Sequence, residues 1–450
     1  MTGSERAVQG IQDQIWKTYS EKFPQCRAAH EKMIQVVPGG ATRSLSYFRP
    51  FPLHITHGKG AKVYTPEGHE MLDVTNAYGA LVHGHGDPDV VRAVQEGIAG
   101  GSQFSTPTQG QYKLAKLLCD RVPGFDRVRF LNSGTEATLF AMRTARAVTG
   151  RDKILKMSGG FHGTHDCVAA STQKNVITAG IPAAMTADMM EVPFNDGDAL
   201  ERMVTAHAHE LAAVIMEPFL GAGGVVLPGD DFLQRARAVT AANDVLLILD
   251  EIFSFRVDEG GCQKRFGITP DLTCVGKVVG GGLPIGVFGG KEEVMKVYCH
   301  ESTDAPLYHS GTFNGYETVM QAGVAALAKY DAPAIERLNR LGEFFQESLL
   351  SLFKSLGLKL QSNQIGSLLN LHFTDQPVTH AAAAQASEAE LHTLFHLSLL
   401  NRDVFNIPRG LFILSTPLTP ADIEGMVDKI GESLKELLPL MEEKYNHLLL

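Results

Sequence analysis

Residues 245–251 read VLLILDE, an uninterrupted apolar run that ends on two carboxylates, Asp250 and Glu251. A run of this length without polar alternation is typical of a strand covered on both faces, as in a parallel sheet. Asp250 then ends a buried strand, where a carboxylate needs a cation or hydrogen-bond donors. The stretch therefore predicts an α/β fold with a functional group at a strand end. A structural aspartate that caps the next segment is the simpler alternative.

The neighbouring sequence repeats this arrangement between about residues 70 and 325. Short apolar runs alternate there with amphipathic helical patterns, such as Ala137–Val148, closed by Gly150, and Asp231–Ala242. This alternation predicts a mainly parallel sheet covered by helices on both faces. We expect its strands at Arg127–Leu131, Lys153–Met157, Ala212–Met216, Val245–Leu249 and Leu272–Val275.

The last 120 residues have a different pattern. A helical stretch at Ile335–Phe353 precedes two short apolar runs, Ser367–His372 and Gly410–Leu414, and a closing helix begins at Pro420. The pattern predicts a smaller α+β domain that the N-terminal segment joins. We therefore expect a large domain over residues 71–325 and a small domain made of residues 1–70 and 326–450.

Composition excludes several classes of function. Hydrophobic residues make up 44% and charged residues 20% of the 450 residues, which is ordinary for a globular protein. The net charge is −10, without basic blocks, so we expect no nucleic-acid or membrane-surface partner. No secretory signal, membrane span or CxxC pair is present, and the six scattered cysteines indicate a cytoplasmic protein. No acidic or cysteine cluster joins the histidine pairs His83/His85 and His162/His165, so we predict no metal site.

Polar residues follow the predicted strands where the strands end. In open parallel sheets, ligand groups collect at these carboxyl ends. We expect such groups at Asn132–Glu136, Ser158–His162, Glu217, Asp250 and Lys277.

Ser133, Gly134 and Thr135 lie between a predicted strand and a predicted helix. Free N–H groups and the helix dipole at such a helix start bind phosphate well, and a glycine allows close approach. An ordinary helix cap without a ligand is the alternative.

Lys277 directly follows the predicted strand Leu272–Val275 and Gly276, and it precedes the glycine run Gly280–Gly282. A lysine at a buried strand end is unfavourable unless it is paired or neutral, and imine formation removes its charge. A solvated strand terminus is the alternative. Neither a dinucleotide site at residues 221–226 nor a P-loop at Lys277 is predicted, because Val226 replaces the third glycine and no Ser or Thr follows Lys277.

Taken together and in this order, the motifs resemble the class III aminotransferase family of fold-type I pyridoxal-phosphate enzymes. The likeness is greatest to its glutamate-1-semialdehyde aminomutase-like branch, and there to bacterial β-phenylalanine (β-amino acid) aminotransferases. It extends from about residue 35 to 435. Further motifs that carry the resemblance are Pro38–Gly40, Asn76–Gly79, Gly84–Gly86, Phe161–Gly163, Glu217-Pro218 and His309–Phe313.

The resemblance implies a role for each matching residue. Lys277 would hold pyridoxal 5'-phosphate as a Schiff base and carry the proton, and Asp250 would keep the pyridine nitrogen protonated. Phe161 would stack on the pyridine ring. The resemblance also implies a homodimer with shared sites. The remaining cofactor residues would be His162 beside the ring, Glu217 near the cofactor hydroxyl, Ser133, Gly134 and Thr135 at the phosphate, and Thr312 from the partner subunit.

Two arginines indicate how a substrate is held. Arg43 and Arg409 match family segments that bind substrate or 2-oxoglutarate carboxylates, and Tyr78 matches a substrate-site tyrosine. Arginine binds carboxylates with two parallel hydrogen bonds, although a surface ion pair is the alternative for each. The Pro-Arg-Gly segment at Arg409 is absent from the aminomutases and favours transamination.

We therefore predict an aminotransferase that moves an amino group from a β-amino or aryl amino acid to a keto acid such as 2-oxoglutarate. The alternatives are a glutamate-1-semialdehyde 2,1-aminomutase, a D-phenylglycine-type or biosynthetic-cluster transaminase, and a non-catalytic protein that binds the cofactor. One departure from the family follows Asp250 and Glu251, where Val and a small or polar residue are usual. This chain has Ile252 and Phe253, and the bulk of Phe253 could reshape the pocket.

Overall fold

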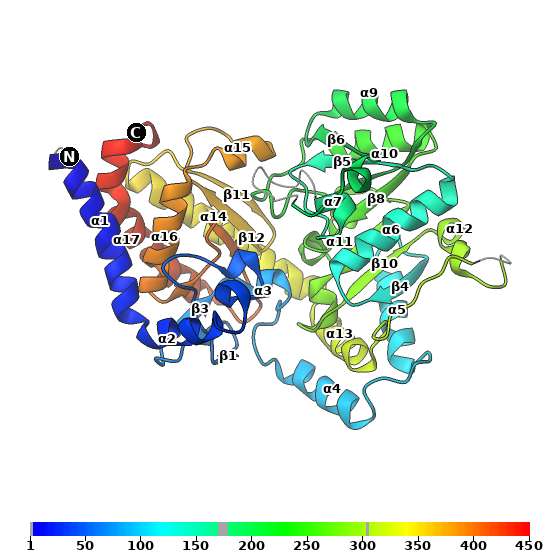
Figure 1. The fold of residues 1–450 in the computed structure, drawn as a ribbon, viewed down its shortest axis with the longest axis horizontal. Coiled ribbons are helices and arrows are strands. Elements are labelled where there is room, and N and C mark those ends of the chain that lie inside the picture. The colour runs from blue at the N-terminus through cyan, green and yellow to red at the C-terminus, as the bar shows by residue number, and fades with distance from the viewer. Residues whose placement is uncertain (1–2, 170–178, 303–305) are drawn as a thin grey trace.

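The structure is a computed structural model that describes residues 3–169, 179–302 and 306–450 (Figure 1). Its strands are β1 (His57–Lys59), β2 (Lys62–Tyr64), β3 (Glu70–Asp73), β4 (Arg127–Leu131), β5 (Lys153–Ser158), β6 (Met189–Pro193), β7 (Leu211–Met216), β8 (Leu246–Asp250), β9 (Leu272–Gly276), β10 (Gly286–Gly290), β11 (Gln361–Ile365), β12 (Leu368–His372), β13 (Val404–Phe405) and β14 (Leu411–Ile413).

The α-helices are α1 (Gly3–Lys22), α2 (Pro24–Met33), α3 (Asn76–Gly79), α4 (Pro88–Ala99), α5 (Gln109–Arg121), α6 (Gly134–Thr149), α7 (Asp166–Ala169), α8 (Ala183–Thr186), α9 (Gly197–His207), α10 (Phe232–Ala242), α11 (Gly261–Phe266), α12 (Glu292–Met295), α13 (Glu317–Lys329), α14 (Ala332–Ser355), α15 (Ala381–Gln385), α16 (Ala389–Asn401) and α17 (Pro420–Lys444). Two 3-10 turns, η3 (Ser254–Val257) and η4 (Lys277–Gly280), follow β8 and β9.

A seven-stranded sheet in the order β4-β10-β9-β8-β7-β5-β6 forms the centre of the larger part of the molecule. Only β10 runs against its neighbours, so the sheet is mainly parallel, as predicted. All five predicted strands belong to it. The sequence pattern does not predict β10, because three of its five residues are glycines. A Cβ at Gly286 would lie 2.0 Å from the carbonyl oxygen of Ser133, so close approach to the start of α6 requires glycine there.

Helices cover both faces of this sheet. Leu247 and Leu249 of β8 pack in a cluster with α9 and α10, whereas Ile248 between them packs in a cluster with α6. Burial on both faces explains why residues 245–249 lack polar alternation. Helix α6 begins after Ser133, whose hydroxyl accepts from the Glu136 N–H, and ends at Gly150 in the left-handed conformation (φ 66°). Both ends agree with the sequence pattern.

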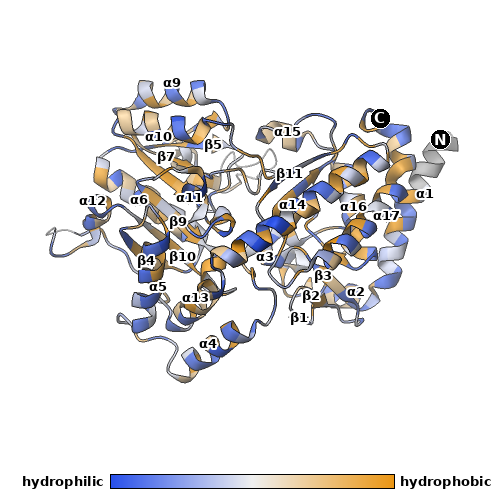
Figure 2. Cartoon of the chain, turned by 180° about the vertical axis from the view of Figure 1, so that it is seen from behind, coloured by the Kyte–Doolittle hydropathy of each residue, from blue (hydrophilic) through white to orange (hydrophobic). Residues whose placement is uncertain are grey.

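Two smaller sheets form the rest of the molecule, in the orders β1-β2-β3-β13 and β11-β12-β14. Strand β13, late in the chain, pairs with β3, and α1 packs against α16 and α17, so both chain ends lie in this part (Figure 1). Helices such as α4 and α14 carry hydrophilic and hydrophobic residues on different sides (Figure 2). In the part of the chain that the structure describes, no helix combines the length and apolar character that a membrane span needs.

The fully buried side chain of Arg256 in η3 links the two parts of the molecule. Its Nε donates to the Ser367 hydroxyl at 2.9 Å and its Nη2 donates to the Leu414 carbonyl, next to β12 and β14. The Tyr330 hydroxyl donates to its carbonyl at 2.6 Å. These partners are all neutral, and burial lowers the pKa of the guanidinium. Arg256 is therefore a buried cation stabilised by oriented dipoles.

We expect Arg256→Met to lower the free energy of unfolding by about 2–4 kcal/mol, because two buried oxygen atoms lose their donor. Thermal unfolding would measure the change. Arg265→Met in α11 is the matched control, because Arg265 is exposed. Equal melting temperatures for the two variants would show that the Arg256 hydrogen bonds contribute no net stability.

Candidate active site

The carboxyl ends of four adjacent strands bring the predicted site residues together. In the order β9-β8-β7-β5, these strands are followed by Lys277, Asp250, Glu217 and the segment Phe161-His162. Because parallel strands end at the same edge, residues far apart in the sequence meet there.

Asp250 is paired with His162 inside the protein. The carboxylate is 3% exposed, its Oδ2 lies 2.8 Å from His162 Nδ1, and its Oδ1 accepts the Ile252 N–H at 3.1 Å. The other ring nitrogen of His162, Nε2, is buried and has no hydrogen-bond partner among the described residues. The histidine thus orients the carboxylate, and the pair has unused hydrogen-bonding capacity.

Glu217 is a second buried carboxylate beside this pair. Its Oε1 accepts the Phe161 N–H at 3.0 Å and its Oε2 accepts the Gly221 N–H at 3.1 Å. Burial raises the pKa of Glu217 to about 7, the positive charge of His162 opposes the rise, and Asp250 adds to it. Phe161, which Glu217 holds through its backbone, keeps 41% of its surface exposed. An exposed aromatic ring next to buried acids is suited to cover a flat ligand.

Lys277 begins η4 with a left-handed backbone (φ 48°). Such a conformation at a non-glycine residue is strained by about 1–3 kcal/mol and is concentrated at functional sites. Burial lowers the pKa of Lys277 to about 8, while the charges of Asp250 and Glu217 oppose the fall. A fraction of the amine is therefore neutral near pH 7 to 8, as a nucleophile requires.

The start of α6 has the predicted cap. The Ser133 hydroxyl accepts the Glu136 N–H at 3.2 Å and donates to the Glu136 carboxylate at 3.0 Å. The Thr135 hydroxyl accepts the Thr164 N–H at 3.3 Å, which ties it to the segment after Phe161. A Cβ at Gly134 would lie 2.7 Å from Ile252 Cδ1, so this turn packs against the segment after β8. The first N–H groups of the helix have no intrahelical acceptor and can bind an anion.

Tyr78 lies near both predicted substrate arginines. The Arg43 guanidinium carbon is 5.5 Å from the Tyr78 ring centroid, and the Tyr78 hydroxyl donates to the Leu45 carbonyl at 3.1 Å. Burial raises the pKa of Tyr78, and the charges of Arg409 and Arg43 both oppose the rise. Arg409 is partly buried, and its Nη1 donates to the Ala222 carbonyl at 3.2 Å. In the described chain neither arginine has a carboxylate partner.

Thr312 was also predicted at the site, but in the described chain no contact connects it to the other site residues. It is exposed on the loop before α13, and its carbonyl accepts a hydrogen bond from Gln103. The sequence pattern also misses two residues of the region. The Gly221 N–H donates to Glu217. The only indication of this contact in the sequence is that a glycine stands four residues after a carboxylate at a strand end. The sequence does give an indication of Arg256, because it is a single cationic residue within the mainly apolar segment that follows Asp250.

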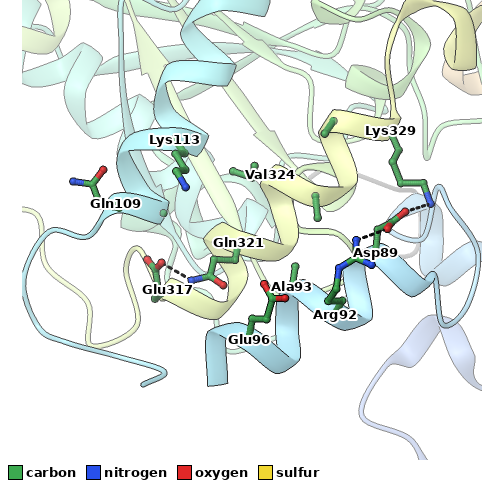
Figure 3. Close-up of a pocket in the computed structure, with 13 residues that line it drawn as sticks. Asp89, Arg92, Ala93, Glu96, Gln109, Lys113, Glu317, Gln321, Val324 and Lys329 are labelled. Carbon is green, nitrogen blue, oxygen red and sulfur yellow. Dashed lines mark hydrogen bonds and ion pairs between the residues drawn. The ribbon is translucent and has the colours of Figure 1, made fainter. Parts of the chain in front are cut away.

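A separate pocket of about 600 Å³ lies between α4, α5 and α13 (Figure 3). Polar side chains line much of it, and several pair with one another: Lys329 contacts Asp89 at 2.9 Å, and Gln321 donates to Glu317 at 2.8 Å. None of the predicted site residues lines this pocket. The candidate active site is therefore the group of residues around Lys277 and Asp250.

Residues 46–393 match the aminotransferase class-III family. A glutamate-1-semialdehyde 2,1-aminomutase of Methanobrevibacter smithii is 38% identical over 381 residues, which are 84% of this chain and 89% of that protein.

Two solved structures extend the similarity. An omega-transaminase from Sphaerobacter thermophilus superposes with a TM-score of 0.88 at 37% identity, covering 91% of this chain and 97% of that one. A β-phenylalanine aminotransferase from Variovorax paradoxus gives a TM-score of 0.90 at 34% identity, covering 96% and 99%. The similarity thus extends over nearly the whole length of the chain.

The buried carboxyl of Glu217 predicts a pH dependence of stability. Its pKa of about 7 exceeds the usual 4.5, so the folded protein binds the proton more tightly than the unfolded chain does. The stability that this proton contributes is complete below about pH 4.5 and is lost as the pH rises through 7. We expect Glu217→Gln, which cannot ionise, to lose less thermal stability than wild type between pH 5.5 and 8. Glu293→Gln at an exposed position is the control; an identical loss in all three proteins would contradict the assignment.

Proposed function

The chain belongs to the class III aminotransferase family, whose cofactor is pyridoxal 5'-phosphate, and from this we propose that it transfers an amino group from a β-amino or aryl amino acid to a keto acid such as 2-oxoglutarate. It has the fold of the fold-type I enzymes. The observation that carries the finer proposal is the pair of arginines near Tyr78, Arg43 and Arg409, which lack carboxylate partners in the described chain.

The residues around Asp250 suit the cofactor. A buried carboxylate oriented by His162 is the partner that a protonated pyridine nitrogen needs, and the buried, unpartnered Nε2 of His162 adds a polar atom beside it. The partly exposed Phe161 ring could cover the flat face of the cofactor, and the amides of Ser133–Thr135 could hold its phosphate. When bound, the cofactor supplies an electron sink that makes the carbon bearing the amino group acidic.

We propose that Lys277 bonds to the cofactor and that its Nζ, once released, moves the proton at the reacting carbon. The lowered pKa of about 8 suits both roles, because the amine can exist in neutral and protonated forms near neutral pH. Asp250 would hold the proton of the ring nitrogen. Glu217 would fix the Phe161 backbone and, with a pKa of about 7, would be only partly ionised near neutral pH.

Arg409 supports a substrate with a carboxylate. A partly buried guanidinium bound to a single backbone carbonyl can exchange that partner for a carboxylate, which binds with two parallel hydrogen bonds. Arg43, whose guanidinium lies against the Tyr78 ring, offers a second anchor. Two anchors would let one pocket hold a β-amino donor and a dicarboxylic acceptor in turn.

A second candidate is glutamate-1-semialdehyde 2,1-aminomutase. The 38% identity to an enzyme of that name favours it. Among the solved structures, the β-phenylalanine aminotransferase at 34% identity favours the transaminase, since a glutamate-1-semialdehyde-aminomutase structure that covers the same 96% of this chain is only 25% identical. A D-phenylglycine-type or biosynthetic-cluster transaminase would use the same proposed cofactor-binding residues with a different amino donor.

We further propose a homodimer in which Thr312, exposed before α13, reaches the partner's phosphate site. A cytoplasmic location and the division into residues 1–70, 71–325 and 326–450 also remain proposals from the sequence.

Lys277 is tested by trapping the cofactor. Borohydride reduction of the yellow protein, followed by peptide mass spectrometry, should find the cofactor on Lys277. Lys277→Ala should lose the visible absorbance, because among the described residues no other lysine lies at this strand end, whereas Lys296→Ala at an exposed position should keep it. A cofactor attached to any other lysine would refute the assignment.

Arg409→Ala separates carboxylate binding from the rest of the reaction. Loss of a charged hydrogen bond costs about 1.5–3 kcal/mol, so we expect kcat/KM for 3-amino-3-phenylpropanoate with 2-oxoglutarate to fall roughly 10- to 150-fold. Arg409→Lys should restore it in part, since a point charge cannot form the two-pronged contact. A carboxylate-free amine, followed in the first half-reaction by the cofactor absorbance, should be much less affected.

Arg340→Ala on the exposed side of α14 is the control for the loss of an arginine. If wild-type enzyme converts glutamate-1-semialdehyde to 5-aminolevulinate without a keto acid and ignores β-amino acids, the transaminase proposal fails and the aminomutase replaces it.

A further inference from the structure

Phe253, the residue that departs from the family pattern, lies against the amine of Lys277. The distance from Lys277 Nζ to the Phe253 ring centroid is 4.5 Å. This is well inside the roughly 6 Å within which the negative face of an aromatic ring attracts a cation. Phe253 is only partly buried, whereas its neighbour Phe219 is completely buried.

Two glycines and a second ring fix the position of Phe253. A Cβ at Gly221 would lie 2.3 Å from Phe253 Cδ1, and one at Gly79 would lie 3.4 Å from Phe253 Cε2. Gly221 does not have a left-handed backbone, so its missing side chain is explained by the ring packed against it. The Phe219 ring is 6.4 Å away, centroid to centroid. The ring therefore cannot be exchanged for a differently shaped group without repacking.

The nearby carboxylates are bonded to other groups. Asp250 binds His162 and the Ile252 N–H, and Glu217 binds two backbone N–H groups. In the described chain the Lys277 ammonium has neither a hydrogen bond nor an ion pair, and the carboxylates act on it only through space. The Phe253 ring is its direct contact.

We propose that Phe253 is a positioning residue that holds the Lys277 amine against its ring face and favours the protonated form of that amine. This rests on the proposed function, in which Lys277 is the cofactor lysine. When a substrate amine displaces Lys277, the free Nζ must stay beside the reacting carbon to move the proton. A ring face attracts the ammonium without accepting its proton, so it can hold Nζ in place and leave the proton available.

The test measures the ionisation of Lys277 in cofactor-free protein, from the pH dependence of its rate of acetylation followed by peptide mass spectrometry. Phe253→Leu keeps the site apolar but removes the ring face, so the pKa of Lys277 should fall by about 0.5–1 unit. Trifluorophenylalanine at position 253 keeps the ring shape and weakens its negative face, and it should lower the pKa in the same direction. Phe219→Leu removes a buried ring that makes no cation–π contact with the amine in the described chain, and it should leave the pKa unchanged.

An unchanged pKa in Phe253→Leu, or a fall in Phe253→Leu without any fall in the fluorinated protein, would overturn the proposal. An equal fall in Phe219→Leu would do so too, because loosened packing would then explain the effect. The proposed function fails separately, if reduction traps the cofactor on a lysine other than Lys277. The acetylation experiment does not depend on that result, since it needs no cofactor and no turnover.

Discussion

The charge of Asp250 at the end of a strand buried on both faces is the constraint around which the site is built. This carboxylate is only 3% exposed, so the protein must supply its partners, and it does so with His162 and the Ile252 N–H. His162 follows β5, two positions away from β8 in the sheet, and Glu217 follows β7 between them. The parallel order of strands is thus what allows one buried carboxylate to be satisfied from a distant part of the sequence.

The same burial shifts two other groups toward neutrality. It raises the pKa of Glu217 to about 7 and lowers the pKa of Lys277 to about 8. At neutral pH the site can therefore hold an amine and an acid that are not both fully charged, although carboxylates and ammonium groups are normally ionised. An enzyme that forms and breaks imines and moves protons near pH 7 needs groups of this kind.

The proposed cofactor-binding groups and the proposed substrate groups come from different parts of the chain. Strand ends of the large sheet supply Lys277, Asp250 and Glu217, whereas Arg409 comes from the segment between β13 and β14. Arg256 links these parts with neutral hydrogen bonds. One family can therefore include proteins named as aminomutases and proteins named as transaminases. The residues proposed to bind the substrate lie largely outside the strand ends that are proposed to bind the cofactor.

The sequence alone determined the features that depend on local interactions. The buried strands β4, β5, β7, β8 and β9, the cap at Ser133 and the end of α6 at Gly150 follow from apolar runs, a short polar side chain and a left-handed glycine, all within a few residues. For the same reason the strand-end residues could be named in advance. Strand order, the antiparallel β10, the His162–Asp250 bond and the packing of Gly221 against Phe253 were decided only by the tertiary structure. Each joins segments tens of residues apart, and a glycine that makes room for a distant ring has the same local sequence signal as a glycine in any loop.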